Sequence, residues 1–222
     1  MQAEPLLRTA LLTRFPGQIA LVSSFGAESA VLLHMVAGID PATPVIFLDT
    51  GKLFAETLRY RKTLAARLGL ADLRVARPDP ARLAGIDAKG ELWQTDPDLC
   101  CWQRKVEPLD EALAGFDAWI TGRKRFQGGQ RRALESIEKD ADGRCKVNPL
   151  ADWTEAQISD YFMRYDLPPH PLAAAGYRSI GCAPCTRPTP SGEDQRDGRW
   201  TGRGKTECGI HLRRALPERV PA

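Results

Sequence analysis

The sequence lacks the features that would direct the chain to a membrane or across one. Its first twenty residues are interrupted by Glu4, Arg8 and Arg14, so they do not form the apolar core of a signal peptide. No apolar run approaches the roughly 18 residues that a bilayer-spanning helix needs. We therefore expect a cytoplasmic protein with no membrane partner.

Two common nucleotide-binding signatures and any large excess of charge are also absent. The chain contains neither the GxxxxGK[ST] of a Walker loop nor the GxGxxG of a dinucleotide fold. Its formal net charge of +3 is too small by itself to favour nucleic acid, so we expect no nucleic-acid partner. A hydrophobic share of 43% in 222 residues is ordinary for a soluble protein with one sizeable core.

Apolar runs and helical patterns alternate along most of the chain. Strands are expected at 19–22, 44–48, 73–79 and 116–122, and helices at 28–36, 54–69, 105–115 and 154–167. This alternation predicts an α/β fold, a mostly parallel sheet flanked by helices. We expect residues 1–165 to form the nucleotide-binding domain and residues 166–222, rich in Pro, Gly and Arg, an irregular C-terminal segment that carries the CxxC pair and a mobile tail.

Small polar residues follow the first two predicted strands. In an open parallel sheet, ligands bind beyond the carboxyl ends of the strands. The turn "SSFGAES" offers hydroxyls, backbone N–H groups and a helix start, which suit an anion such as phosphate. An ordinary strand-to-helix turn is the alternative. The candidate binding residues here are Ser23, Ser24, Gly26, Ala27, Glu28 and Ser29 in the first turn, and Asp49, Thr50 and Gly51 after the second strand.

Four of the six cysteines occur as two close pairs, Cys100–Cys101 and Cys182–Cys185. In a reducing cytoplasm such pairs favour metal binding or chemistry over disulfides. Two thiolate pairs can surround a zinc ion or an iron–sulfur cluster, and adjacent ligands fit the separate iron corners of a cluster better. Unliganded buried thiols are the remaining alternative. Cys145 has no partner and is interpreted as incidental.

Two further segments carry basic residues. The loop "TGRKRFQGGQRR" follows a predicted strand and could close over phosphate or sulfate oxygens, although a solvated loop is the alternative. In the tail, Cys208 follows Arg199, Arg203 and Lys205, and a thiol in such surroundings is partly ionised at neutral pH. From its neighbours alone, Cys208 can equally be interpreted as a nucleophile or as an incidental terminal thiol.

These motifs, in this order, resemble the assimilatory adenylyl-sulfate reductases and the related phosphoadenylyl-sulfate reductases. The resemblance runs from "SSFGAES" through "LDTGKLFAETLRY", "CCWQRKVEPL", "WITGRKRFQGGQR" and "SIGCAPCTRP" to "ECGIHL". It implies a fold like that of the adenine-nucleotide alpha-hydrolases, with the adenylyl group over the first loop. It departs from the family pattern at Phe25 and in the loop at 123–125.

The resemblance also implies roles for single residues. The cysteines Cys100, Cys101, Cys182 and Cys185 would ligate a 4Fe-4S cluster, and Lys105 would link that cluster to the substrate. Three arginines, Arg132, Arg196 and Arg199, would grip the phosphosulfate, and we place His211 among the substrate contacts.

The implied reaction is the reduction of adenylyl sulfate to sulfite and AMP in sulfate assimilation. Cys208 would attack the sulfur, and thioredoxin or glutaredoxin would then release sulfite from the resulting S-sulfonate. The alternatives are the same reaction on 3'-phosphoadenylyl sulfate, a PP-loop enzyme that activates a substrate with ATP, and a zinc module that binds nucleic acid. A homo-oligomer is left open.

Overall fold

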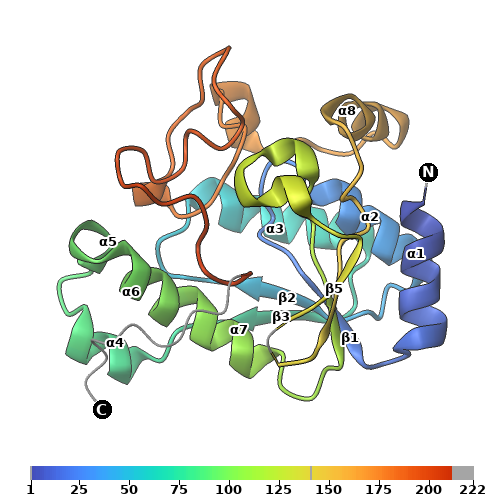
Figure 1. Ribbon diagram of the computed structural model, residues 1–222, viewed down its shortest axis with the longest axis horizontal. Helices are drawn as coiled ribbons and strands as arrows, with labels where there is room; N and C mark the ends of the chain where they lie inside the picture. Colours follow the sequence, from blue (N-terminus) through green and yellow to red (C-terminus); the bar gives the residue numbers. More distant parts are fainter. Residues whose placement is uncertain (1, 141, 212–222) are drawn as a thin grey trace.

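Short strands form one central sheet in the computed structural model, which describes residues 2–140 and 142–211 (Figure 1). The strands in this part of the chain are β1 (Ile19–Val22), β2 (Val45–Leu48), β3 (Leu73–Ala76), β4 (Ala118–Ile120), β5 (Ile137–Lys139) and β6 (Cys145–Val147). Their order across the sheet is β3-β2-β1-β4-β6-β5. Every pairing is parallel except that of β5 with β6. The predicted mostly parallel α/β sheet is confirmed.

Strands β5 and β6 are not among the predicted strands. Each has three residues, and β5 exposes two of its three positions, so neither carries a long apolar run. The backbone of β6 nevertheless pairs with β4, and this placement buries Cys145 opposite Ala118. Cys145 therefore belongs to the packed interior of the sheet.

Helices cover both faces of the sheet. Their bounds are α1 (Ala3–Thr9), α2 (Ser29–Ile39), α3 (Ala55–Leu68), α4 (Pro80–Ile86), α5 (Leu92–Thr95), α6 (Pro97–Cys101), α7 (Glu107–Ala112) and α8 (Glu155–Arg164). Helix α2 contacts α1, α3 and α8, whereas α7 contacts β2 and β3. Figure 1 shows α6 and α7 as one diagonal rod, because a π-helical turn at Trp102–Val106 joins them. In the described residues, no helix is both long and apolar enough to cross a membrane.

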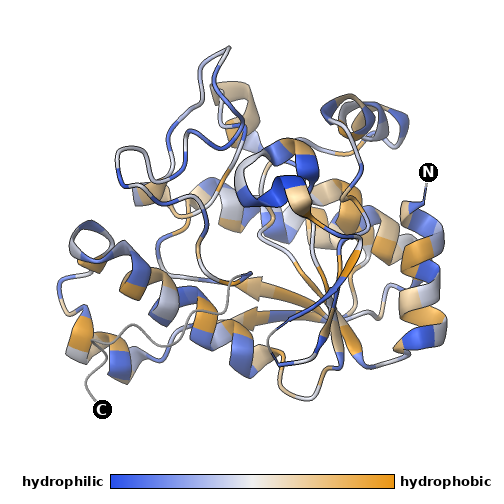
Figure 2. Ribbon diagram, in the orientation of Figure 1, coloured by the Kyte–Doolittle hydropathy of each residue, from blue (hydrophilic) through white to orange (hydrophobic). Residues whose placement is uncertain are grey.

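Alternating strand residues supply the two halves of the core. Leu21 and Phe47 point to the same side as the apolar residues of α2 and α3, and Ala20 and Trp119 face Leu109 of α7. Strands β1 and β2 are accordingly orange on the hydropathy scale of Figure 2, and the loops that follow them are mostly blue or white. The polar residues are thus concentrated at the ends of the strands.

Capping residues end or begin two helices where the sequence predicts it. Gly69 closes α3 with a left-handed backbone, at φ 63°, and its N–H bonds to the last turn. Thr154 caps α8 through the N–H of Gln157, whose side chain bonds back to Thr154. These boundaries follow from local chemistry alone.

The segment after α8 contains only short turns of helix within its described residues, at Pro171–Ala175 and Ala183–Cys185. An isolated bridge joins Leu53 to Cys182 and attaches the segment to the loop after β2. In Figure 1 its red end descends to the sheet near the arrowheads of the strands. The segment therefore lies over the edge where ligands of such sheets bind.

Candidate active site

The switch in strand order opens a crevice between β1 and β4. The chain proceeds from β1 to β2 and β3 on one side, then crosses to β4 and β6 on the other. Loops after β1 and β4 therefore leave the sheet in different directions, which is where nucleotides bind in this architecture. A cavity of about 210 Å³ occupies this position.

The first loop, from Ser23 to Ser29, is shaped by a buried aromatic ring. Phe25 has a left-handed backbone, at φ 49°, and its fully buried ring meets the Phe47 ring edge-on at 5.5 Å. The Ser23 hydroxyl accepts the Phe25 N–H at 3.2 Å, and the Ser29 hydroxyl accepts the Gly26 N–H at 2.9 Å. A bulky residue rarely adopts this conformation, so core packing of Phe25 holds the strained turn against the cavity.

Most of the predicted substrate residues line this one cavity. They are Ser23, Ser24, Gly26, Ala27, Glu28, Ser29, Thr50, Lys105, Arg196, Arg199 and His211, together with Cys208. They come from the first loop, the loop after β2, the turn between α6 and α7, and the C-terminal segment. The structure thus brings together residues that lie up to 188 positions apart in the chain.

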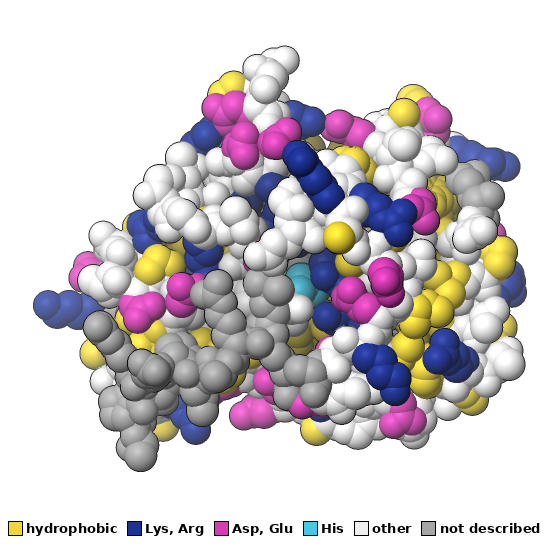
Figure 3. Space-filling view, in the orientation of Figure 1, with side chains coloured by type: hydrophobic (Ala, Val, Ile, Leu, Met, Phe, Trp, Pro, Cys, Tyr) yellow, Lys and Arg dark blue, Asp and Glu magenta, His cyan; other side chains and the backbone are white. Residues whose placement is uncertain are grey.

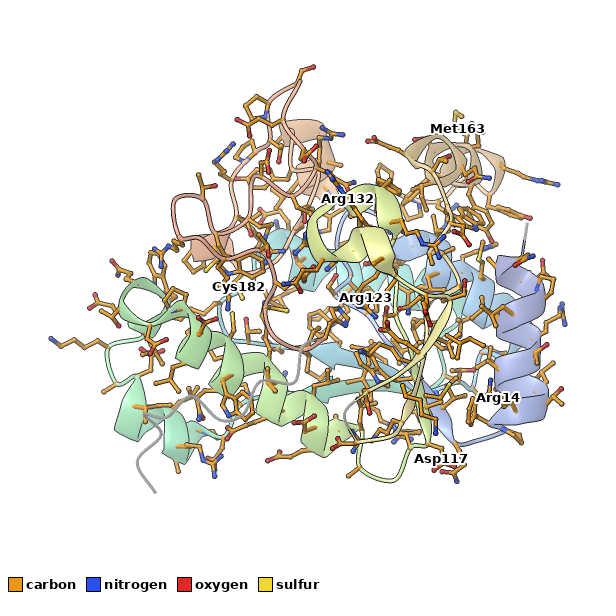
Figure 4. The ribbon with its side chains drawn as sticks, in the orientation of Figure 1. Arg14, Asp117, Arg123, Arg132, Met163 and Cys182 are labelled. Atoms are coloured by element: carbon orange, nitrogen blue, oxygen red, sulfur yellow. The ribbon has the colours of Figure 1, made fainter. Side chains whose placement is uncertain are left out.

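Three predicted residues lie elsewhere. Asp49 pairs with Arg77 at 3.3 Å, and Gly51 forms an exposed bend with φ 68°. Arg132 is exposed on the loop after β4, whereas Arg131 lines the cavity. Figure 4 shows Arg132 on the outer part of that loop and Arg123 nearer the centre of the molecule.

The loop after β4 is held in place by Glu28. Buried Lys124 donates to one Glu28 oxygen at 2.7 Å, and Gln127 donates to the same oxygen at 3.2 Å. The other oxygen accepts from Gln195 at 2.6 Å. Glu28 therefore joins the first loop, the basic loop and the C-terminal segment, and these contacts hold the basic loop, which forms two short 3₁₀ turns.

Arginine side chains crowd one wall of the cavity. Burial, with the added charge of Arg131, lowers the pKa of Arg196 to about 10. The Arg199 guanidinium lies over the Trp200 ring at 4.3 Å. It also rests against Gly181, where an added Cβ would lie 2.2 Å from one of its nitrogens. Figure 3 shows basic side chains gathered around a histidine near the middle of this face.

Cys208 lies in a tail that closes one side of the cavity. The preceding carboxylate, Glu207, is paired with Arg131 and Arg196. After it, Ile210 packs against the core group around Trp119, and the His211 ring stacks parallel to Trp119 with centroids 5.5 Å apart. Burial lowers the pKa of His211 well below its usual value, and four nearby cations lower it further. His211 is therefore neutral at physiological pH.

The four paired cysteines line a second, smaller cavity. Cys100 and Cys101 end α6, and Cys182 and Cys185 flank the turn at Ala183–Cys185. Burial and the neighbouring thiols raise the pKa of Cys100 to about 12. Within residues 2–140 and 142–211, no three His, Cys, Asp or Glu side chains form a group that could hold a metal ion. Figure 4 labels Cys182 close to the centre of the structure.

Lys105 connects the two cavities because it lines both. Burial alone would lower its pKa, but the thiolate charges of Cys182, Cys208 and Cys101 raise it above the usual lysine value. The π-helical turn at Trp102–Val106 places this side chain, and such turns are frequent at functional sites. The lysine is therefore charged and lies within electrostatic reach of both Cys208 and the cysteine pairs.

The sequence reasoning missed several residues of the site. Arg131 differs from the predicted Arg132 by one position, and a pair of adjacent arginines gives no local signal of which one faces inward. Glu207 and Trp119 were also missed. The motif "ECG" points to Glu207 by its position beside Cys208, whereas Trp119 resembles any buried strand residue.

The sequence matches one protein family and named relatives. The phosphoadenosine phosphosulfate reductase domain matches residues 18–188. A Mesorhizobium japonicum protein named adenosine 5'-phosphosulfate reductase is 56% identical over 198 residues, which cover 89% of this chain and 78% of the relative. A Gloeobacter violaceus protein named phosphoadenosine 5'-phosphosulfate reductase is 42% identical over 89% of this chain and 83% of the relative.

Solved structures agree with these relatives. The crystal structure of phosphoadenylyl-sulfate reductase from Candida auris in complex with phosphate superposes with a TM-score of 0.71 and is 30% identical, covering 84% of this chain and 91% of that chain. An FMN adenylyltransferase from Candida glabrata superposes with a TM-score of 0.61 at 19% identity, covering 85% of this chain and 65% of that chain. The second similarity shows a shared fold only.

Proposed function

Because this chain belongs to the phosphoadenosine phosphosulfate reductase family, we propose that it reduces adenosine 5'-phosphosulfate to sulfite and AMP. The observation that carries the proposal is the cavity between β1 and β4, where Cys208 meets the first loop and the arginines. A nucleophile, an anion-binding loop and several cations in one crevice suit attack on an anionic nucleotide. The relative from Mesorhizobium japonicum, named for this activity, supports the choice of substrate.

The nucleotide would occupy the cavity with its anionic end toward the basic wall. The adenylyl group would lie over the first loop, between Ser23 and Ser29. Lys105 and Arg199 are available to the phosphosulfate, whereas Lys124 is paired with Glu28 and Arg196 with Glu207. These cations would offset the repulsion between a thiolate and an anionic substrate.

The reaction proceeds through three displacements at sulfur. The Cys208 thiolate forms a bond to the sulfur of adenosine 5'-phosphosulfate, the sulfur–oxygen bond to phosphate breaks, and AMP leaves with that electron pair. A cysteine S-sulfonate then remains on Cys208. A thiolate of thioredoxin or glutaredoxin attacks the Cys208 sulfur and expels sulfite, and its second thiol resolves the mixed disulfide. The two thiols of that partner supply both electrons.

We further propose that Cys100, Cys101, Cys182 and Cys185 hold a 4Fe-4S cluster. Four thiols around one cavity form the donor set of such a cluster, and its ligands reach separate iron atoms instead of sharing one ion. When bound, the cluster would supply a fixed anionic centre beside Lys105. A reducing cytoplasm would keep all these thiols free for ligation. Analysis of iron and acid-labile sulfide in purified protein tests the assignment, and colourless protein with one zinc would overturn it.

Mass spectrometry tests the nucleophile. The protein is mixed with adenosine 5'-phosphosulfate in the absence of a reducing partner, and the masses of its cysteine peptides are measured. We expect a sulfonate adduct on the Cys208 peptide, and none in Cys208→Ser. Cys145→Ser is the matched control, because Cys145 is buried in β6 and should leave the adduct unchanged. An adduct on any other cysteine would show that the nucleophile is misassigned.

The 3'-phosphorylated nucleotide is the second candidate substrate. The relative from Gloeobacter violaceus and the structure from Candida auris are both named for it. Sulfite release is measured with each nucleotide and reduced thioredoxin at equal concentrations. We expect a higher kcat/KM for adenosine 5'-phosphosulfate, and an equal or reversed ratio would assign the phosphorylated substrate instead.

A further inference from the structure

Glu207 is a buried carboxylate of the active site that is paired with two arginines. Its side chain is only 8% exposed, and it receives two bonds from Arg131, at 2.5 and 3.0 Å to its two oxygens. Arg196 approaches the second oxygen at 3.2 Å. Burial would raise the pKa of Glu207, but these arginines lower it, so the carboxylate is ionised. A buried, bidentate pair of this kind is among the stronger polar contacts in proteins.

The two arginines come from different parts of the chain. Arg131 lies in the 3₁₀ turn Gly129–Ala133 of the basic loop and also donates to Gln127. Arg196 belongs to the C-terminal segment and also donates to the carbonyl of Thr206 at 2.7 Å. The backbone just before Cys208 is therefore held by side chains from both sides of the cavity.

We propose that Glu207 is a positioning residue, which anchors the tail and so holds Cys208 inside the cavity. Residues after Cys208 have their own apolar contacts, through Ile210 and the stack of His211 on Trp119. Gly209, with φ 96°, makes the turn between the two attachments. Cys208 thus lies between a polar anchor and an apolar one, and Glu207 is the carboxylate of the polar anchor.

The anchor leaves charge for the substrate. Two guanidinium groups face a single carboxylate, so Arg131, Arg196 and Glu207 together keep a net positive charge. The tail can therefore close without cancelling the field that attracts an anionic nucleotide. The role of Glu207 in sulfite formation rests on the proposed function, but its role in holding the tail does not.

Alkylation of Cys208 in the absence of any nucleotide tests the anchor directly. Wild type, Glu207→Gln and Glu193→Gln are treated with iodoacetamide, and the modified Cys208 peptide is quantified over time by mass spectrometry. The rates are measured up to the high-pH plateau, where the thiol is fully ionised, so that a changed thiol pKa cannot imitate a changed exposure. Glu193 is the matched control because its pair with Arg187, at 2.8 Å, lies outside the cavity.

We expect the plateau rate of Glu207→Gln to exceed that of wild type by about tenfold, since the variant loses the charge that strengthens the hydrogen bonds from Arg131 and Arg196. Arg131→Gln should show a similar increase, and the double variant no more than either single variant. Glu193→Gln should match wild type. The proposal would be overturned if the plateau rate of Cys208 alkylation were unchanged in Glu207→Gln, or if it rose equally in Glu193→Gln.

A single-turnover experiment separates this inference from the proposed function. With saturating adenosine 5'-phosphosulfate, Glu207→Gln should form the Cys208 adduct about tenfold more slowly than wild type. Its affinity for AMP, which does not need Cys208, should not fall, because the variant removes no positive charge from the cavity; weakened AMP binding would count against a positioning role. If wild type forms no adduct while the alkylation plateau still rises in Glu207→Gln, the anchor stands and the assigned reaction fails.

Discussion

Gly181→Ala should displace the Arg199 side chain although no charged residue is substituted. A Cβ at position 181 would lie 2.2 Å from one Arg199 nitrogen and 2.5 Å from its central carbon. Ordinary contact begins near 3.4 Å, so the guanidinium would have to retreat by about 3.4 − 2.2 = 1.2 Å. Trp200, whose ring lies 4.3 Å from the guanidinium carbon, restricts that retreat.

The displacement of Arg199 should lower the activity and leave the stability of the fold nearly unchanged. If Arg199 contacts the phosphosulfate, its displacement removes a charged hydrogen bond of about 1.5–3 kcal/mol, which is about a tenfold to 150-fold loss in kcat/KM. The displaced group is the end of a flexible side chain, so the free energy of unfolding should change by less than about 1 kcal/mol. Sulfite release with thioredoxin measures the first quantity, and urea unfolding measures the second.

Two further variants complete the test. Arg199→Ala should lose a similar factor, and Gly181→Ala combined with Arg199→Ala should lose no more than Arg199→Ala alone. Gly38→Ala, at a helical position with no atom within 4 Å of the added Cβ, should keep full activity. Full activity in Gly181→Ala, or additive losses in the double variant, would refute the assigned role of Arg199.

Three predictions concern the scaffold around the site. Asp87→Asn should destabilise the fold by about 3–5 kcal/mol in urea unfolding, because it breaks a buried ion pair in which Asp87 and Arg104 lie 2.6 Å apart. A loss of stability below about 1 kcal/mol would contradict this prediction. Burial lowers the pKa of His170 from 6.5 to about 4, so the stability of the wild type should decline as pH falls from 6.5 toward 4. Thermal unfolding across this range should show a weaker decline in His170→Gln, and an identical decline would assign it to other groups. Thr154→Ala should cost about 1 kcal/mol through its lost cap, with exposed Ser159→Ala as the neutral control, and equal losses would exclude the cap as the cause.

The outline of the fold could be predicted because its signals are local. The strands at Ile19–Val22 and Val45–Leu48 are continuous apolar runs, and Gly69 and Thr154 mark helix ends by their own backbone or side-chain chemistry. Strands β5 and β6 could not be predicted, because each is short and is interrupted by charged residues, as Ile-Glu-Lys and Cys-Lys-Val. The pairing of β6 with β4 supplies the backbone hydrogen bonds that make Cys145–Val147 a strand.

Part of the site could also be predicted, because the paired cysteines and the small-residue turn after the first strand are local motifs that can be read from adjacent residues. The partners of the charged residues could not be predicted. Glu28 was expected to bind substrate, but its two oxygens are occupied by Lys124, Gln127 and Gln195. Each of these contacts joins residues that are far apart in the chain, so no local sequence pattern predicts them.

Sequence alone determined which chemical groups this protein has: four paired thiols, one thiol in a basic tail and a turn of small polar residues after a buried strand. Tertiary structure decided which of them meet. It turned Arg131 and not Arg132 into the cavity, and it set Glu207 between two arginines at the cavity that Cys208, Lys105 and the first loop also line. The physical reason is that side-chain type is a local property, whereas burial and charge pairing depend on what the rest of the chain brings alongside.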